Sequence, residues 1–266
     1  MLCMKTELLS KLSQDLAELK KAGLFKNEYE IATPQSSHIE LANGKPVLNF
    51  CANNYLGLAD NPEVIEAAKK SYEKYGFGLA SVRFICGTQT IHLQLEKRIS
   101  EFLGTEDTIL YSSCFDANGG LFETILGPED AIISDALNHA SIIDGCRLAG
   151  SRIVRYAHCD ADDLERAFND EKGKYGRALV VTDGVFSMDG DIAPLPALVK
   201  LAEKYEATLI VDDAHAVGVI GEDGSGTAAH FGLQGKIDLQ VGTMSKALAA
   251  EGGYVAGKKI FIDYLV

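Results

Sequence analysis

The sequence predicts an α/β fold built on a seven-stranded, mainly parallel sheet with helices on both faces. The first observation is that strand-like apolar runs alternate with segments of helical periodicity from about residue 60 onward, which is typical of a parallel sheet covered on both sides. The second is length, because 266 residues suffice for one large domain, alone or with a small one. The third is composition, since 26 Gly and only 6 Pro suit many tight strand-to-helix turns.

The N-terminal part differs from this rhythm. Residues 6–22 carry leucines at helical spacing with Lys and Glu between them, which predicts an amphipathic helix. Residues 38–50 predict a short hairpin with an Asn-Gly pair at its turn. We therefore expect an N-terminal helix and hairpin segment over residues 1–55 and a large domain over residues 56–266.

The large domain should contain six helices and seven strands. The predicted helices are 62–75, 91–103, 116–126, 138–149, 160–170 and 195–205. The predicted strands are 107–112, 131–134, 152–157, 178–183, 208–213, 238–242 and 253–256. Parallel sheets bind ligands at the carboxyl ends of their strands, so the polar residues that follow the strands are where we look for chemistry.

Charge and cysteine usage exclude several classes of function. The net charge of −13 disfavours nucleic acid or an anionic membrane surface as the main partner. Six scattered cysteines without C-x-x-C spacing indicate reduced thiols in a cytoplasmic protein and give no zinc motif. The charged N-terminus does not resemble a signal peptide, and no apolar run approaches the roughly 20 residues that span a bilayer. We expect neither a metal nor a membrane partner.

Asp212 and His215 follow a strand and form the first candidate site. A carboxylate there can keep a cationic ring nitrogen protonated, as in pyridoxal-phosphate (PLP) enzymes, while His215 hydrogen-bonds the ring oxygen. The same Asp-Asp-x-His pattern is also compatible with a helix cap or with the metal site of a hydrolase.

Lys246 follows the next strand, on a turn inside an apolar, Gly-rich stretch. Desolvation lowers the pKa of such a lysine, and the neutral amine can attack an aldehyde. Thr243 and Ser245 offer hydroxyls to a phosphate. The alternative is an ordinary exposed turn lysine, but the Asp-x-x-His pattern 34 residues earlier favours the functional interpretation.

Two further strand-to-helix junctions carry unusual polar residues. Residues 112–120 offer main-chain N–H groups at a helix N-terminus, which bind phosphate well, although a simple N-cap is the common alternative. His139, at the other junction, could stack on a planar ring or be structural.

Taken together, these motifs resemble the α-oxoamine synthases, a family of PLP enzymes of the fold-type I transferase class. The matching stretches are 50–58, 80–88, 112–120, 134–145, 182–190 and 211–218. Two of them, around 112–120 and 134–145, are particularly similar to the branch that condenses glycine with acetyl-CoA.

The resemblance implies a role for each matching residue. Lys246 would bind the cofactor covalently and later act as the base, Asp212 would pair with the pyridine nitrogen, and His215 would contact the ring oxygen. His139 would stack over the ring as a catalytic, cofactor-binding and substrate-facing residue.

The remaining implied contacts concern the phosphate and the substrate. The main chain at Cys114 and Phe115, with the Thr243 hydroxyl, would bind the phosphate. Asn53 and Ser187 would approach the substrate, and Ser187 would also contact the cofactor. The resemblance further implies a homodimer, with the active site at the subunit interface.

The sequence departs from the family pattern in two places. Residues 249–253 form a loop one residue shorter than usual, which places Glu251 near the site. The family also continues for over a hundred residues beyond the equivalent of Val266, into a small domain that carries a carboxylate-binding arginine. We therefore expect this chain to bind PLP but to turn over glycine and acetyl-CoA very poorly. The alternatives are a sister enzyme that uses another acyl-CoA and a protein that binds PLP without activity.

Overall fold

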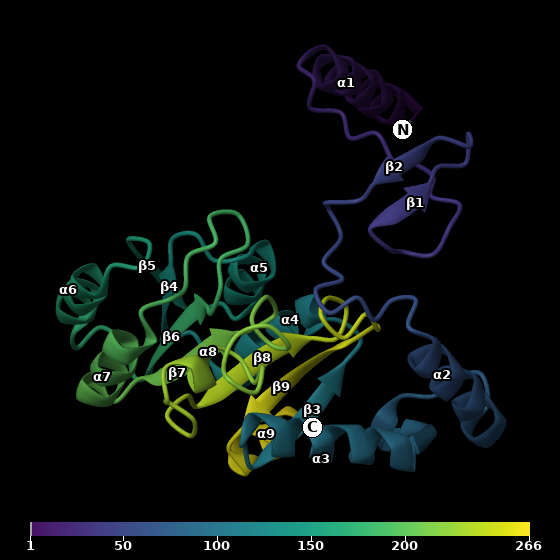
Figure 1. The fold of residues 1–266 in the computed structure, drawn as a ribbon. Coiled ribbons are helices and arrows are strands. Elements are labelled where there is room, and N and C mark those ends of the chain that lie inside the picture. Colours follow the sequence, from purple (N-terminus) through teal and green to yellow (C-terminus); the bar gives the residue numbers. More distant parts are fainter. Residues whose placement is uncertain (1) are drawn as a thin grey trace. The chain divides into compact units, whose positions relative to one another are not determined.

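The computed structural model describes residues 2–266, with side chains from residue 5 onward, as two compact units that divide between Phe50 and Cys51 (Figure 1). The first unit contains helix α1 (Leu2–Lys21) and a two-stranded antiparallel sheet of β1 (His38–Glu40) and β2 (Pro46–Leu48). The predicted helix and hairpin both form, and the helix begins four residues earlier than the leucine pattern indicated.

The second unit is built on one sheet of seven strands among the described residues, which confirms the predicted fold class. The strand order is β3-β9-β8-β7-β6-β4-β5. The strands are β3 (Asp107–Tyr111), β4 (Ala131–Asp135), β5 (Arg152–Tyr156), β6 (Ala178–Asp183), β7 (Thr208–Asp212), β8 (Leu239–Thr243) and β9 (Gly253–Gly257). The pairs among β4 to β8 are parallel, whereas β9 runs antiparallel to both β8 and β3.

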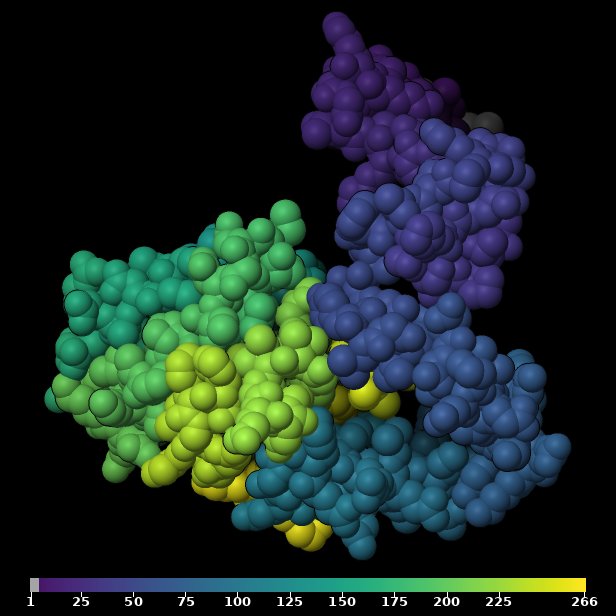
Figure 2. Space-filling view, viewed as in Figure 1, coloured from purple at the N-terminus to yellow at the C-terminus, as the bar shows by residue number. Residues whose placement is uncertain are grey.

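The direction of β9 follows from the length of its connection. Only residues 244–252 separate β8 from β9, and a parallel crossover needs a dozen residues or more. The chain must therefore turn back on itself, which places the loop after Lys246 at the same sheet edge as the ends of the parallel strands. The space-filling view shows the C-terminal residues, in yellow, lying against teal residues near position 100 (Figure 2).

Helices cover both faces of the sheet. The helices of this unit are α2 (Pro62–Tyr75), η1 (Arg83–Gly87), α3 (Thr90–Leu103), α4 (Cys114–Ile125), α5 (Ala140–Leu148), α6 (Ala161–Glu171), α7 (Leu195–Tyr205), α8 (Thr227–His230) and α9 (Lys259–Leu265). No residue of α2 is buried, so α2 is not one of the helices that cover the sheet. The short segments η1, α8 and α9 were not predicted. The predicted helix near 138–149 begins later, at Ala140, because His139 is its N-cap.

Side chains of the central strands alternate between two hydrophobic cores. On β6, Val180 packs with α6 and α7 in one core, whereas Leu179 and Val181 pack with α4 and α5 in the other. On β7, Ile210 joins the second core and its neighbours the first. Because side chains of a strand point alternately to opposite faces, this division shows that both faces are buried. No helix of the described residues is long and apolar enough to cross a membrane.

Candidate functional site

A pocket of about 240 Å³ lies where the parallel strands β7 and β8 end and helix α4 begins. Most of the residues predicted to bind the cofactor line this one pocket. They are Cys114, Phe115, His139, Asp212, His215, Thr243 and Lys246. The sheet brings them together because each follows a strand whose carboxyl end lies at the same edge.

A chain of hydrogen bonds leads from Lys246 to two residues before α2. The Lys246 Nζ lies 2.9 Å from His215 Nε2, and His215 Nδ1 lies 2.7 Å from the Tyr55 hydroxyl. Tyr55 in turn donates to the Asn53 Oδ1 at 3.1 Å. Asn53 was predicted to face the substrate, and the structure places it two hydrogen bonds from His215. Tyr55 was not predicted, although it belongs to one of the stretches that carry the resemblance.

Burial changes the charge of both basic groups in this chain. Burial lowers the pKa of Lys246, although Asp212 and Asp183 partly oppose the shift. Burial, and then the Lys246 charge, lowers the pKa of His215 to about 4. His215 is therefore a neutral imidazole at neutral pH, and the Lys246 amine loses its proton more readily than an exposed lysine.

Asp212 is almost fully buried and is held from two sides. Asn118 Nδ2 donates to its Oδ2 at 2.8 Å, and the Ala214 N–H donates to its Oδ1 at 3.0 Å. The thiol of Cys114 lies 3.6 Å from the same carboxylate. Asn118 is a site residue that sequence reasoning missed. One signal was available, because Asn118 lies one helical turn after Cys114 and so shares its face of α4.

The neighbouring carboxylate, Asp213, serves a different purpose. Its two oxygens accept hydrogen bonds from the main-chain N–H and the hydroxyl of Thr227, at 2.9 and 2.6 Å. It is buried on the opposite side of the strand end, and burial raises its pKa to about 6. Asp212 and Asp213 therefore do not converge, which argues against the metal site that the Asp-Asp-x-His pattern allowed.

A second carboxylate that the sequence reasoning did not single out also lines the pocket. Asp183, the last residue of β6, lies beside Asp212 of β7 in the sheet register. Its Oδ2 accepts a hydrogen bond from the His139 N–H at 2.7 Å. Burial and the adjacent Asp212 raise the pKa of Asp183 to about 8.

The start of α4 forms one wall of the pocket. The Ser113 hydroxyl caps the helix by accepting from the Asp116 N–H, so the main-chain N–H groups of Cys114 and Phe115 have no partner within the helix. Gly253 of β9 packs directly on the main chain of Ser113 and Cys114, where a Cβ atom would not fit. On the opposite wall, the Thr243 hydroxyl lies 2.8 Å from that of Ser245.

Ser187 lies in an adjoining pocket of about 220 Å³. That pocket shares His139, Asp183 and His215 with the first one. The predicted substrate-facing serine is therefore next to the predicted cofactor site, across a wall formed by His139 and Asp183.

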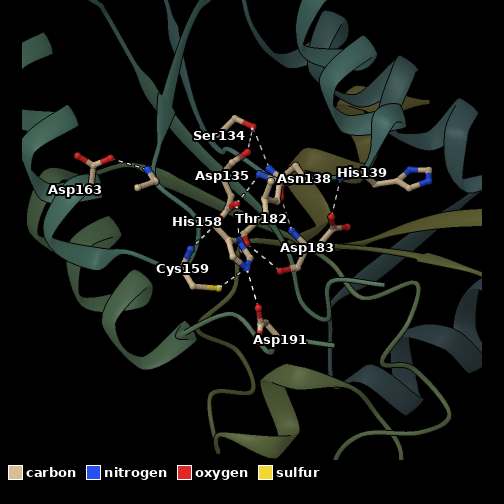
Figure 3. A network of polar contacts seen from close by, with 12 residues as sticks. Ser134, Asp135, Asn138, His139, His158, Cys159, Asp163, Thr182, Asp183 and Asp191 are labelled. Carbon is tan, nitrogen blue, oxygen red and sulfur yellow. Dashed lines mark hydrogen bonds and ion pairs between the residues drawn. The ribbon is translucent and has the colours of Figure 1, made fainter. Parts of the chain in front are cut away.

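One group among the described residues could hold a metal ion, and it does not include the Asp-Asp-x-His pattern that the sequence left open as an alternative. Asp135, His158 and Cys159 have potential ligand atoms within 4.8 Å of one another (Figure 3). Both nitrogens of His158 already face carboxylates, Asp135 at 3.0 Å and Asp191 at 3.2 Å. The hydrogen bonds account for this cluster, and none of its members lines the pocket of Lys246.

Comparison with known proteins gives three likenesses. A family model described as aminotransferase class I and II matches residues 45–266. The chain is 53% identical over 264 residues to 2-amino-3-ketobutyrate coenzyme A ligase of Escherichia coli K12, covering 98% of this chain and 66% of that protein. It is 50% identical over 254 residues to 8-amino-7-oxononanoate synthase of Thermoanaerobacter pseudethanolicus, covering 96% of this chain and 64% of that protein.

Solved structures are similar over nearly the whole chain. A serine palmitoyltransferase from S. paucimobilis with bound PLP–myriocin aldimine has a TM-score of 0.88 and 35% identity, covering 97% of this chain and 66% of that one. The chain spans about 66% of the length of the relatives that it matches.

Proposed function

Because this chain belongs to the aminotransferase class I and II family and, as its sequence indicated, to the α-oxoamine synthases, we propose that it is a PLP-dependent acyltransferase. The proposed reaction condenses glycine with acetyl-CoA to give 2-amino-3-ketobutyrate and CoA, or runs in reverse in threonine breakdown. The observation that carries the proposal is one pocket that combines a buried lysine, a buried carboxylate and unpaired N–H groups at a helix N-terminus.

The residues of the pocket fit PLP. Asp212 is buried, accepts only neutral donors and forms no ion pair with any described residue, which suits it to a cationic ring nitrogen. The N–H groups of Cys114 and Phe115, with the Thr243 hydroxyl, would hold the phosphate. Lys246 would hold the cofactor covalently, and His139 would lie over its ring. When bound, PLP supplies an electron-withdrawing ring that stabilises negative charge on the α-carbon of an amino acid.

Lys246 is suited to both nucleophilic and proton-transfer roles. Burial lowers the pKa of its amine, so the neutral form that attacks an aldehyde is more accessible than in an exposed lysine. The same Nζ would take the α-proton of glycine, and a lowered pKa brings a lysine closer to the operating pH at which a general base works. His215, neutral and 2.9 Å away, holds Nζ in place by a hydrogen bond.

Asn53 and Ser187 would approach the substrate from two sides of the pocket. Asn53 is linked to His215 through Tyr55, and Ser187 lies behind His139 and Asp183. We also propose a homodimer, as the family resemblance implies, and a division of the chain into an N-terminal segment of residues 1–55 and a cofactor-binding domain of residues 56–266.

A second candidate is a sister enzyme that uses a different acyl-CoA. The 50% identity to an 8-amino-7-oxononanoate synthase supports it almost as well as the 53% identity supports the acetyl-CoA reaction. The proposed role of the Lys246 pocket is the same for both candidates, so it does not choose between the acyl-CoAs that they use.

A spectroscopic titration tests the proposal. Adding PLP to the protein should produce the visible absorbance of lysine-bound cofactor, and glycine should change that spectrum. Lys246→Ala should show only the spectrum of free PLP. In the whole protein, CoA release with acetyl-CoA would be compared with release with longer acyl-CoAs, and a preference for a longer chain would favour the second candidate. A wild-type spectrum equal to that of Lys246→Ala would contradict both.

A further inference from the structure

Two buried residues join the turn before α5 to the end of β6. Asp183 Oδ2 accepts a hydrogen bond from the His139 N–H at 2.7 Å, and Asn138 Oδ1 accepts one from the Asp183 N–H at 2.8 Å (Figure 3). Asn138 and Asp183 are 4% and 6% exposed. Because the two hydrogen bonds run in opposite directions, neither segment can move without losing one of them.

Asn138 is itself fixed by the neighbouring strands. Its Nδ2 donates to Ser134 Oγ at 3.0 Å and to the Val181 carbonyl at 2.9 Å. Ser134 belongs to β4 and Val181 to β6, which are adjacent in the sheet. The Asn138 amide therefore uses its oxygen and its nitrogen in defined directions, and it anchors the turn before α5 to the sheet.

His139 is held at two points by this arrangement. Asp183 holds its main-chain nitrogen, and Ser141 Oγ lies 2.8 Å from its Nδ1. Its imidazole lines the pocket of Lys246, and Figure 3 shows the ring pointing away from Asn138 while the main chain faces Asp183. The position of the ring thus depends on the position of the Asp183 carboxyl group.

The charge of Asp183 is compatible with this task. Asp183 and Asp212 are adjacent in the sheet register, and two neighbouring buried carboxylates do not both ionise readily. Burial and Asp212 raise the pKa of Asp183 to about 8. The raised pKa favours the protonated form of Asp183, which still accepts a hydrogen bond and adds no second negative charge beside Asp212.

We propose that Asp183 is a positioning residue that holds the main chain of His139 so that its imidazole faces the cofactor ring, and that Asn138 holds the same turn against β6. The inference rests on the proposed function for the identity of the ligand, but the hydrogen bonds of Asp183 and Asn138 form without the ligand. Asp183 acts through His139, so its effect must disappear when the imidazole is removed.

A double-mutant cycle tests this dependence. PLP affinity would be measured by absorbance titration for the wild type, Asp183→Ala, His139→Ala and the double variant. Loss of one hydrogen bond should weaken PLP binding about two- to tenfold in Asp183→Ala, and the same change should have no effect in the His139→Ala background. Asp183→Asn should retain near-wild-type affinity, because its amide oxygen can still accept from His139. An equal loss in both backgrounds would overturn the proposal.

A second readout needs no cofactor. In the apoprotein, histidine side-chain ¹H–¹³C spectra should show a His139 ring that is rigid in the wild type and Asp183→Asn but mobile in Asp183→Ala. If Asp183→Ala does not fold, Asp183→Ser, whose side chain is too short to reach the same N–H, replaces it. Unchanged His139 signals would overturn the positioning role, whereas failure of the wild type to bind PLP would contradict the proposed function instead.

Discussion

Replacing Asp212 by Asn should impair proton abstraction from glycine far more than it impairs PLP binding. In the proposed function this carboxylate keeps the ring nitrogen protonated, and an adjacent opposite charge shifts a pKa by about 1 to 3 units. Removing it should lower the pKa of the ring nitrogen by the same amount. At a pH above both pKa values of the ring nitrogen, its protonated fraction, and with it the rate of α-proton exchange, should fall about 10- to 1000-fold, since each pKa unit corresponds to about 1.4 kcal/mol.

The variant should also lose stability without any ligand. Both Asp212 oxygens accept from donors, Asn118 Nδ2 and the Ala214 N–H, so an amide NH₂ at either position meets another donor. One buried donor pair is left unsatisfied, at a cost of about 1–3 kcal/mol. Thermal denaturation of the apoprotein measures this loss.

Asp213→Asn is the matched control. It replaces a neighbouring buried carboxylate that accepts two hydrogen bonds from Thr227 and lies outside the pocket, so it should exchange the glycine α-proton normally. The assay is ¹H NMR of glycine in D₂O with PLP-saturated protein. Equal exchange rates in the wild type and Asp212→Asn would refute this reasoning, as would an equal loss in Asp213→Asn.

Two further variants test other parts of the account. Gly253→Ala should force the main chain at Ser113 and Cys114 to shift, which should cost about 1–3 kcal/mol of stability and weaken PLP binding. Gly119→Ala should be neutral or stabilising, because its added Cβ has only the tip of Leu148 nearby, at 3.9 Å. Equal PLP titrations for the two variants would contradict this expectation. For His158, partial burial alone would lower the pKa, but the hydrogen bonds of Asp135 and Asp191 raise it. Its stabilisation is therefore complete below the ordinary pKa of histidine and is lost as pH rises through the raised value. The melting temperature of His158→Gln should accordingly lie furthest below that of the wild type near pH 6 and approach it as pH rises, and a constant difference would contradict the ion-pair interpretation.

The sheet was predictable because its signal is local and repeated. Each buried strand reads as a short apolar run between helical segments, so all seven strands were located within one or two residues of their observed bounds. The antiparallel direction of β9 could also have been predicted, because only residues 244–252 connect it to β8. The helix α9 was missed because only seven residues form it, too few for a periodic pattern.

The site was predictable where a functional residue follows a strand in the sequence. Lys246, Asp212 and His139 were found in that way. Asn118 and Tyr55 were missed, since their contacts with Asp212 and His215 join side chains 94 and 160 residues apart in the sequence. The two carboxylates Asp212 and Asp213 look equivalent in the sequence, and only the strand geometry separates the one in the pocket from the one bound to Thr227.

The central claim is that Lys246 forms the covalent bond to PLP. The most direct measurement is borohydride reduction of the PLP-loaded protein, followed by proteolysis and mass spectrometry of the peptides. The account predicts a single pyridoxyl label on Lys246, with none in Lys246→Ala. Labelling of another lysine in the wild type, with Lys246 unmodified, would contradict it.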